Sequence, residues 1–195
     1  MPLVVLILPV MLFLFGGRQT DFANATQGDT GQQRIQLWSQ GLVLFRQAPV
    51  FGIGANRFAD QLGWVAHNSF VHAFTELGLF GGSMYFGAFF IAISNLYRLR
   101  DAKCARLDPE LNRFRPYLLS AVAGYAVGSL TISRCYVTPT YLILGLPCAF
   151  LALVDPGVTP EPRRLNQKLI GKVLFLSIVF LAVTYLYCRL FARWG

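Results

Sequence analysis

The sequence predicts an all-α, polytopic transmembrane helical bundle of about five spans, with one polar loop on the extracytoplasmic side. Its residues are 55% hydrophobic and 13% charged, whereas soluble domains are about 45–50% apolar and roughly 25% charged. Long apolar runs alternate with short basic connectors, which is typical of a helical membrane protein. We therefore attribute the net charge of +8 to cytoplasmic connectors and to contact with membrane lipids that have anionic headgroups, and we do not expect nucleic-acid binding.

The first predicted transmembrane span, residues 1–16, is short. As a helix, residues 3–16 cover only about 21 Å at 1.5 Å per residue, against a hydrocarbon core of about 30 Å. A signal peptide is the alternative, but the run has no basic n-region and no good small-residue cleavage site after it. We therefore predict the second half of a span whose start has been lost, and hence a truncated piece of a larger protein.

Residues 17–68 are predicted to form a polar periplasmic loop that carries an amphipathic helix over residues 31–47. Thr30 and Gln33 fit a capping box, and Pro49 ends the helix. Between them, apolar residues recur at steps of three and four: Ile35, Trp38, Leu42 and Phe45. Such a helix would lie along the membrane surface, although the same apolar stripe would also pack against neighbouring spans.

Residues 69–154 are predicted to hold three transmembrane spans. These are residues 69–97, 117–133 and 140–154, of which the last two form a close pair. Two GxxxG patterns, Gly78 with Gly82 and Gly124 with Gly128, suit close helix contacts in lipid.

Basic connectors set the predicted orientation. Residues 98–116 carry six Lys and Arg residues, which places this connector in the cytoplasm and the loop 17–68 on the opposite side. Residues 155–169 form a second basic, cytoplasmic connector, and residues 170–195 form the last span and its tail. Arg189 and Arg193 in that tail would then lie outside, which departs from the charge rule.

All basic residues of the predicted loop are arginines: Arg18, Arg34, Arg46 and Arg57. A guanidinium offers planar, bidentate donors that suit phosphate, and its charge does not titrate. Arg57 follows a glycine-rich turn whose backbone amides could cradle an anion, although a simple tight turn also explains the glycines. Arg46 at the helix end could instead interact with the helix dipole, and Arg18 could simply flank the first span.

Polar residues mark the start of the long predicted span. Asn68, His72 and Glu76 follow one another at steps of four and so share one helical face. An ionisable group two turns inside a span rarely faces lipid, so this face is predicted to point into a protein cavity. The simpler interpretation of His72 and Glu76 is a structural clamp, in which Glu76 pairs with an arginine or with His72. For His67, at the mouth of the predicted site, we favour a function as a base at neutral pH.

Other site chemistries lack support in the sequence. His67 and His72 are five residues apart without an HExxH motif, and the four cysteines are scattered, so no metal ion and no cofactor are expected. No close pair of carboxylates suggests a glycosidase, and no Ser/His/Asp spacing suggests a hydrolase. A base beside phosphate-binding arginines instead suits activation of a hydroxyl against a substrate with a pyrophosphate leaving group.

Several segments together resemble a known family. They are Arg34…Trp38, Ala48-Pro49-Val50-Phe51-Gly52-Ile53-Gly54, Ala66-His67-Asn68-Ser69-Phe70 and Glu76-Leu77-Gly78-Leu79-Phe80-Gly81. In this order they resemble the O-antigen ligase and polymerase superfamily, over about residues 34–153. The resemblance implies a multi-pass protein of the bacterial inner membrane, and specifically the C-terminal part of a GT-C-like membrane glycosyltransferase.

The resemblance also implies an activity. This is metal-independent, inverting transfer of a glycan from undecaprenyl pyrophosphate to a hydroxyl of an acceptor glycan or lipid. Arg34 and His67 then take the catalytic positions, with His67 as the base and Arg34 on the pyrophosphate. Arg57 is not a firm motif position, but it lies in the right neighbourhood and joins the predicted pyrophosphate site. The supporting polar residues are Asn68, His72 and Glu76.

Two alternatives remain beside this activity. The chain lacks the N-terminal half of the family and has a short loop, so the transfer reaction is expected of it only as part of a larger assembly. One alternative is an anion (bicarbonate-like) transporter, in which the arginines attract an anion and Glu76 lines its path. The other is an inactive membrane scaffold fragment.

Overall fold

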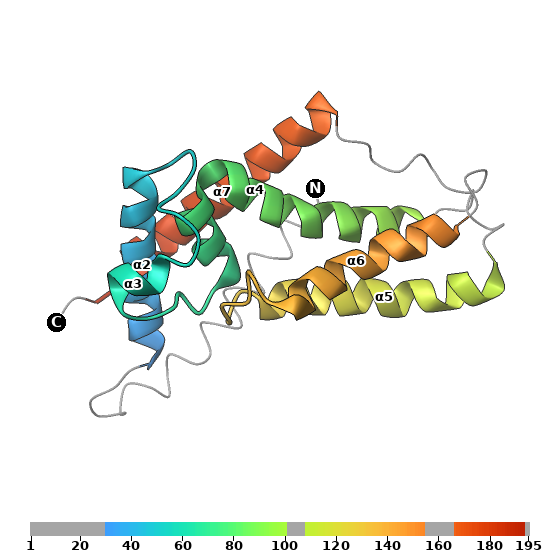
Figure 1. The fold of residues 1–195 in the computed structure, drawn as a ribbon, viewed down its shortest axis with the longest axis horizontal. Coiled ribbons are helices and arrows are strands. Elements are labelled where there is room, and N and C mark those ends of the chain that lie inside the picture. The colour runs from blue at the N-terminus through green and yellow to red at the C-terminus, as the bar shows by residue number, and fades with distance from the viewer. Residues whose placement is uncertain (1–29, 101–107, 155–165, 194–195) are drawn as a thin grey trace.

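The computed structural model describes residues 30–100, 108–154 and 166–193, and all regular structure within these ranges is helical (Figure 1). The all-α class is therefore confirmed for the described part of the chain, whereas the predicted span 1–16 and Arg18 lie outside it. The helices are α2 (Thr30–Gln47), α3 (Phe58–Leu62), α4 (Ser69–Arg98), α5 (Pro109–Gly128), α6 (Thr138–Leu153) and α7 (Gln167–Phe191).

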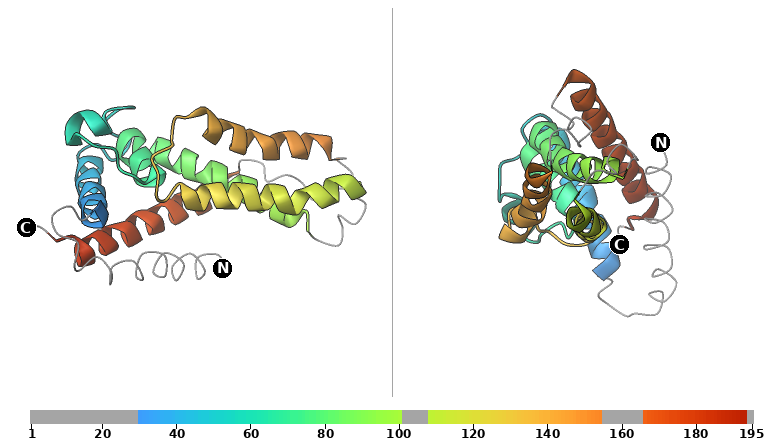
Figure 2. Two further views of the ribbon diagram at one scale, coloured as in Figure 1. Left: turned by 90° about the horizontal axis from the view of Figure 1, so that it is seen from below. Right: turned by 90° about the vertical axis from the view of Figure 1, so that its right-hand side faces the viewer.

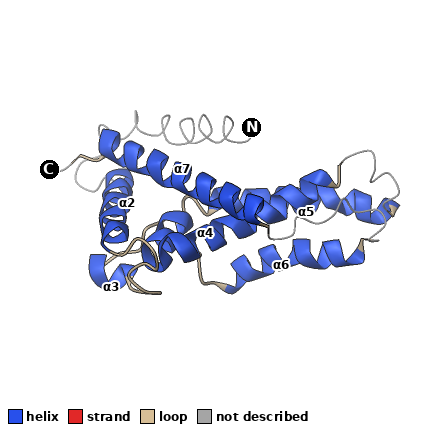
Figure 3. Cartoon of the chain, turned by 90° about the horizontal axis from the view of Figure 1, so that it is seen from above, coloured by secondary structure: helices blue, strands red, loops and turns tan. Residues whose placement is uncertain are grey.

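Helix α2 lies across one end of the helical bundle. In two views at right angles it stands steeply to α5, α6 and the second part of α4, which run side by side (Figures 1 and 2). Helix α7 crosses this group obliquely and reaches α2 with its C-terminal end (Figure 3). The end of α4, the start of α5 and the end of α6 all lie at the opposite end of the bundle from α2 and α3. The basic residues at the end of α4 and near the start of α5, which include Arg98, Arg113 and Arg115, are thus separated from α2 by the length of the bundle.

Two apolar clusters hold the helices together. One lies among α4, α5 and α6 and is built around Phe89, Leu96 and Val122. The other packs α2 against α3, the start of α4 and the end of α7; its α2 members are Ile35, Trp38 and Leu42. The apolar stripe predicted for α2 therefore faces neighbouring helices, and each large apolar side chain buried there contributes about 1.5–3 kcal/mol relative to exposure in water.

The helices differ from the predicted spans in number and in bounds. Among the described residues, α4 and α7 are long and apolar enough to cross a membrane, and α6 is a shorter apolar helix. Helix α5 begins at Pro109, inside the predicted connector 98–116, and ends at Gly128 rather than at residue 133. It begins there because the Asp108 side chain caps it, accepting a 2.8 Å hydrogen bond from the Glu110 N–H. The total of about five spans stays a prediction.

Within the predicted span 69–97, α4 is broken at Gly78, a feature that was not predicted from the sequence. This residue has φ 67° and ψ −167°, whereas the residues on either side continue as helix. Such a backbone conformation is open to glycine almost alone. The break leaves backbone N–H and C=O groups in the middle of α4 without their helical partners, and these groups form part of the site described below.

The predicted glycine contacts between helices are also corrected. Gly78 packs against a loop rather than against a helix, and a Cβ atom at Gly124 or Gly128 would meet nothing within 4 Å among the described residues. Close helix contacts occur at other glycines. A Cβ at Gly87 would lie 2.9 Å from a Val173 methyl group, so this glycine lets α4 and α7 approach.

Candidate functional site

A glycine loop, defined here as residues 48–57, fills the break in α4. Backbone groups that a broken helix leaves unpaired are costly when buried, and this loop pairs four of them. Two α4 amides donate to loop carbonyls, and two loop amides donate to α4 carbonyls. The pairs are Leu79 N to Pro49 O (2.8 Å), Phe80 N to Val50 O (3.1 Å), Ile53 N to Thr75 O (3.1 Å) and Gly54 N to Glu76 O (2.9 Å).

Two glycines allow the loop to approach α4 this closely. Gly52 has φ +74° and Gly78 has φ +67°, so both take a left-handed conformation that disfavours other residues. A Cβ atom on Gly52 would overlap the backbone of Glu76, and one on Gly78 would overlap the carbonyl of Val50. The glycines that carry the family resemblance in sequence are therefore partners in space.

Glu76 fixes the far end of the glycine loop. Its side chain is fully buried, with an exposed fraction of 0%. The carboxylate accepts hydrogen bonds from the backbone N–H of Asn56 (2.8 Å to Oε2) and of Phe58 (2.7 Å to Oε1). Because Arg57 lies between these two residues, the Glu76 carboxylate holds the backbone on both sides of Arg57.

His72 extends this network to the turn between α5 and α6. Its Nε2 lies 3.0 Å from Oε1 of Glu76, and its Nδ1 lies 3.2 Å from the hydroxyl of Ser133. The imidazole packs against the ring of Phe58 (centroids 5.0 Å apart) and the edge of Tyr136 (6.1 Å). The polar face of α4 is thus enclosed by protein in the geometry of a structural clamp, with His72 as the partner of Glu76.

His67 stands between two anchored residues. On one side, the indole N–H of Trp38 on α2 donates a buried 2.6 Å hydrogen bond to the carbonyl of Ala66. On the other side, Asn68 caps α4, and its Oδ1 accepts from the second and third amides that follow it, at 3.0 and 3.1 Å. His67 itself has φ +50°, a conformation that is uncommon outside glycine and is concentrated at functional sites.

Arg34 lies close enough to His67 to act on its charge. The pKa of His67 is lowered from its ordinary value, first because partial burial disfavours the imidazolium and second because of the positive charge of Arg34. The imidazole is therefore neutral at pH 7. A neutral imidazole beside a permanent cation can accept a proton next to a bound anion.

The remaining predicted residues occupy other places. Arg57 is exposed and sits at the N-cap of α3, and it is not among the groups that shift the pKa of His67. The structure thus brings Arg34 and His67 together and sets Arg57 on the turn that Glu76 holds. Asn68 is buried, and its side-chain amide nitrogen has no hydrogen-bond partner among the described residues.

Sequence reasoning missed the contact between α2 and the end of α7. Gln32 and Gln36 donate side-chain hydrogen bonds to the backbone carbonyls of Phe191 (3.2 Å) and Arg193 (2.6 Å). In return, the Arg193 N–H donates to the Gln32 side chain at 3.2 Å. Arg189 and Arg193, the tail arginines that depart from the predicted charge rule, therefore lie at the same end of the bundle as Arg34. Their departure from the charge rule was a feature of the sequence that could have indicated this contact.

The described residues offer cations and an imidazole rather than a metal site. Within their ranges, no group of three His, Cys, Asp or Glu side chains is placed to hold a metal ion. The chemistry that the geometry offers is electrostatic binding of an anion, combined with transfer of one proton.

A comparison with models of known protein families gives a match. Residues 1–86 match the family model described as O-Antigen ligase, and this range holds all the predicted site residues, although it ends well before the residue 153 expected from the motifs. No curated protein and no solved structure matches the chain. The family match confirms the resemblance found in the sequence: residues 1–86 of this chain are similar to the O-antigen ligase family.

Proposed function

We propose that the chain takes part in transferring a glycan from a polyprenyl diphosphate carrier, such as undecaprenyl pyrophosphate, to an acceptor hydroxyl. The reaction takes place at the periplasmic face of the bacterial inner membrane. The family match supports a glycan-transfer role of the ligase or polymerase type. The observation that carries the proposal further is the neutral imidazole of His67 beside the guanidinium of Arg34.

In the proposed step, His67 is the base and the arginines stabilise the leaving group. The acceptor oxygen forms a bond to the anomeric carbon of the glycan as the bond from that carbon to the diphosphate oxygen breaks. The hydroxyl proton moves to His67, and the polyprenyl diphosphate leaves with the electron pair. Arg34 and Arg57 bind its phosphates, because guanidinium groups form strong, bidentate hydrogen bonds to phosphate.

Substrate binding would also strengthen the base. In the free protein, the charge of Arg34 is one of the two causes that lower the pKa of His67. A bound diphosphate compensates this charge, so the pKa of His67 rises and the imidazole accepts the acceptor proton more readily. The base is thus neutral before the donor arrives and more basic once it is bound.

Asn68, His72 and Glu76 serve this site by positioning. Asn68 fixes the start of α4 directly after His67, and Glu76, held by His72, fixes the backbone around Arg57. None of these three side chains needs to touch the substrate in order to affect transfer.

The test separates donor binding from transfer. His67→Ala should abolish glycan transfer in membranes that contain the chain, while binding of farnesyl diphosphate to the purified protein remains. Arg34→Ala should weaken both, because a charge-assisted contact contributes about 1.5–3 kcal/mol, or more than tenfold in affinity.

Gln61→Ala is the matched control, since Gln61 is an exposed residue of α3 near the same loop. Wild-type transfer by the His67→Ala chain would exclude the base assignment. Anion uptake into proteoliposomes without any glycan transfer would favour the transporter alternative instead.

A further inference from the structure

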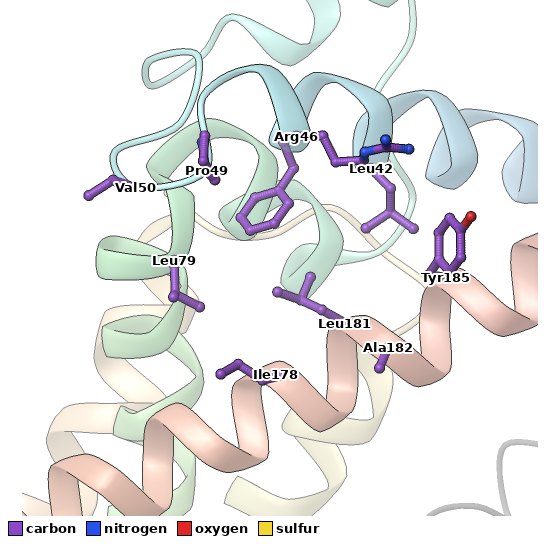
Figure 4. Close-up of a pocket in the computed structure, with 10 residues that line it drawn as sticks. Leu42, Arg46, Pro49, Val50, Leu79, Ile178, Leu181, Ala182 and Tyr185 are labelled. Carbon is purple, nitrogen blue, oxygen red and sulfur yellow. The ribbon is translucent and has the colours of Figure 1, made fainter.

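An apolar groove lies at the other end of α2 from Arg34. It has a volume of about 620 Å³ and opens between the C-terminal part of α2, the start of the glycine loop, α4 just after its break, and α7 (Figure 4). Its volume falls within the range of about 300–1,000 Å³ that is typical of small-molecule sites. Its walls are mainly aliphatic and its rim is polar; the residues that matter here are Leu42, Leu79, Ile178, Leu181, Arg46 and Tyr185.

The groove combines a hydrocarbon surface with one cationic group. The guanidinium of Arg46 and the hydroxyl of Tyr185 lie on the same side of the groove, whereas Leu79 and Ile178 lie on its other side (Figure 4). Arg46 is the one charged residue among those that line the groove, so no acidic side chain there compensates it. This pattern fits a ligand with an apolar chain below a negatively charged head.

The volume limits the length of the chain. If a methylene group takes about the volume of a water molecule, about 30 Å³, the groove holds a chain of about twenty carbon atoms. One fatty acyl chain is of this size, whereas a long polyprenyl chain is several times larger. The groove therefore fits a membrane phospholipid better than it fits the complete tail of a polyprenyl carrier.

The groove is also distinct from the site around His67. Arg34 and Arg46 are twelve positions apart on α2, which corresponds to about 18 Å at 1.5 Å per residue. The groove and the site around His67 thus lie at opposite ends of α2. Because α2 lies across the end of the bundle (Figures 1 and 2), both arginines could meet headgroups in one surface layer, each with its own lipid.

We propose that this groove binds one acyl chain of an anionic glycerophospholipid, with Arg46 on the phosphate and the Tyr185 hydroxyl beside it. The lipid fastens the C-terminal part of α2 to α7 and so helps to hold the helix that carries Arg34. This inference does not depend on the proposed glycan transfer, because it rests on a different arginine and a different surface.

The test is lipid binding to the purified full chain in detergent, measured by native mass spectrometry. The probes are dioleoyl phosphatidylglycerol and dioleoyl phosphatidylcholine, which share their acyl chains and differ in net charge. We expect one tightly bound phosphatidylglycerol and about tenfold weaker binding of phosphatidylcholine, the difference that one charge-assisted contact provides. Arg46→Gln should remove the preference, whereas Arg46→Lys should keep most of it.

Matched variants separate groove effects from general ones. Ala182→Phe fills the groove without changing charge and should weaken binding of both lipids, because Ala182 lines the groove. Ala121→Phe and Arg113→Gln change exposed residues of α5, at a distance from the groove, and should change nothing.

Two results would overturn the proposal. One is phosphatidylglycerol binding that survives both Arg46→Gln and Ala182→Phe unchanged. The other is displacement of the bound phosphatidylglycerol by an equimolar amount of farnesyl diphosphate, because the groove would then belong to a diphosphate lipid.

Discussion

Replacing Gly78 by alanine should break the junction between α4 and the glycine loop. Gly78 adopts φ 67° and ψ −167°, where a residue other than glycine costs about 1–3 kcal/mol. The added Cβ would also overlap the carbonyl oxygen of Val50, so the loop must move. Two hydrogen bonds beside the break, at 2.8 and 3.1 Å, would then weaken, each contributing about 0.5–1.5 kcal/mol.

The combined cost is about 2–6 kcal/mol of unfolding free energy. The assay is thermal unfolding of the purified protein in detergent, in which Gly78→Ala should lower the apparent Tm by at least about 5 °C. Gly124→Ala is the matched control, since a Cβ at Gly124 meets nothing within 4 Å and alanine favours a helix over glycine by about 1 kcal/mol. Equal Tm values for Gly78→Ala and wild type, with Gly124→Ala unchanged or higher, would refute the account of the break.

Four further predictions address the site. Arg34→Gln should raise the pKa of His67 only partway toward its ordinary value of about 6.5, because burial, the larger cause of the lowering, remains; NMR titration of the labelled imidazole measures this. The kcat/KM of wild-type transfer, which reports the free protein, should accordingly persist as the pH falls to about 6.5 and decline only below it, as His67 gains a proton. A decline in kcat/KM that begins at higher pH would contradict the lowered pKa of His67 in the free protein. Glu76→Gln should cost about 1–3 kcal/mol, because the amide cannot accept both backbone hydrogen bonds and leaves a buried N–H group unpaired. It should also reduce farnesyl diphosphate binding, whereas the same change at exposed Glu110 should do neither. Trp38→Phe should leave a buried carbonyl next to His67 unpaired, at a cost of about 1–3 kcal/mol, and should slow transfer more than it weakens donor binding.

The sequence was sufficient to predict the helices whose apolar spacing was regular. The stripe of Ile35, Trp38 and Leu42 predicted α2, and these side chains are buried in the structure. The start of α5 could also have been found, because Asp108 followed by Pro109 is a helix N-terminus signal. The density of basic residues around it outweighed that signal and led to a connector in its place.

The break in α4 was not visible in the sequence, because Gly78 lies in an apolar run that is hydrophobic enough for a continuous span. What forces the break is a set of backbone hydrogen bonds from the glycine loop, and backbone pairing between distant segments leaves little trace in side-chain periodicity. The backbones of Gly52 and Gly78 approach each other closely in the folded structure. The spacing of the two glycines along the chain does not predict this contact.

The residue types of the site could be predicted from the sequence, but the structural role of each residue could not. Steps of four correctly placed His72 and Glu76 on one face, but the sequence could not tell that Ser133 and the amides around Arg57 would enclose them. The hydrogen bond from Trp38 that anchors the segment before His67 depends on how α2 crosses the start of α4. Such crossings are fixed by tertiary packing and not by local pattern.

If a diphosphate binds Arg34 within reach of His67, the pKa of His67 should differ with and without farnesyl diphosphate, and NMR titration of the imidazole measures this difference. The bound diphosphate should raise this pKa in the wild-type chain, because it compensates the charge of Arg34. In the Arg34→Gln chain, the rise should be lost. Saturable binding of farnesyl diphosphate that leaves the pKa of His67 unchanged in wild type would show that the diphosphate does not bind at Arg34.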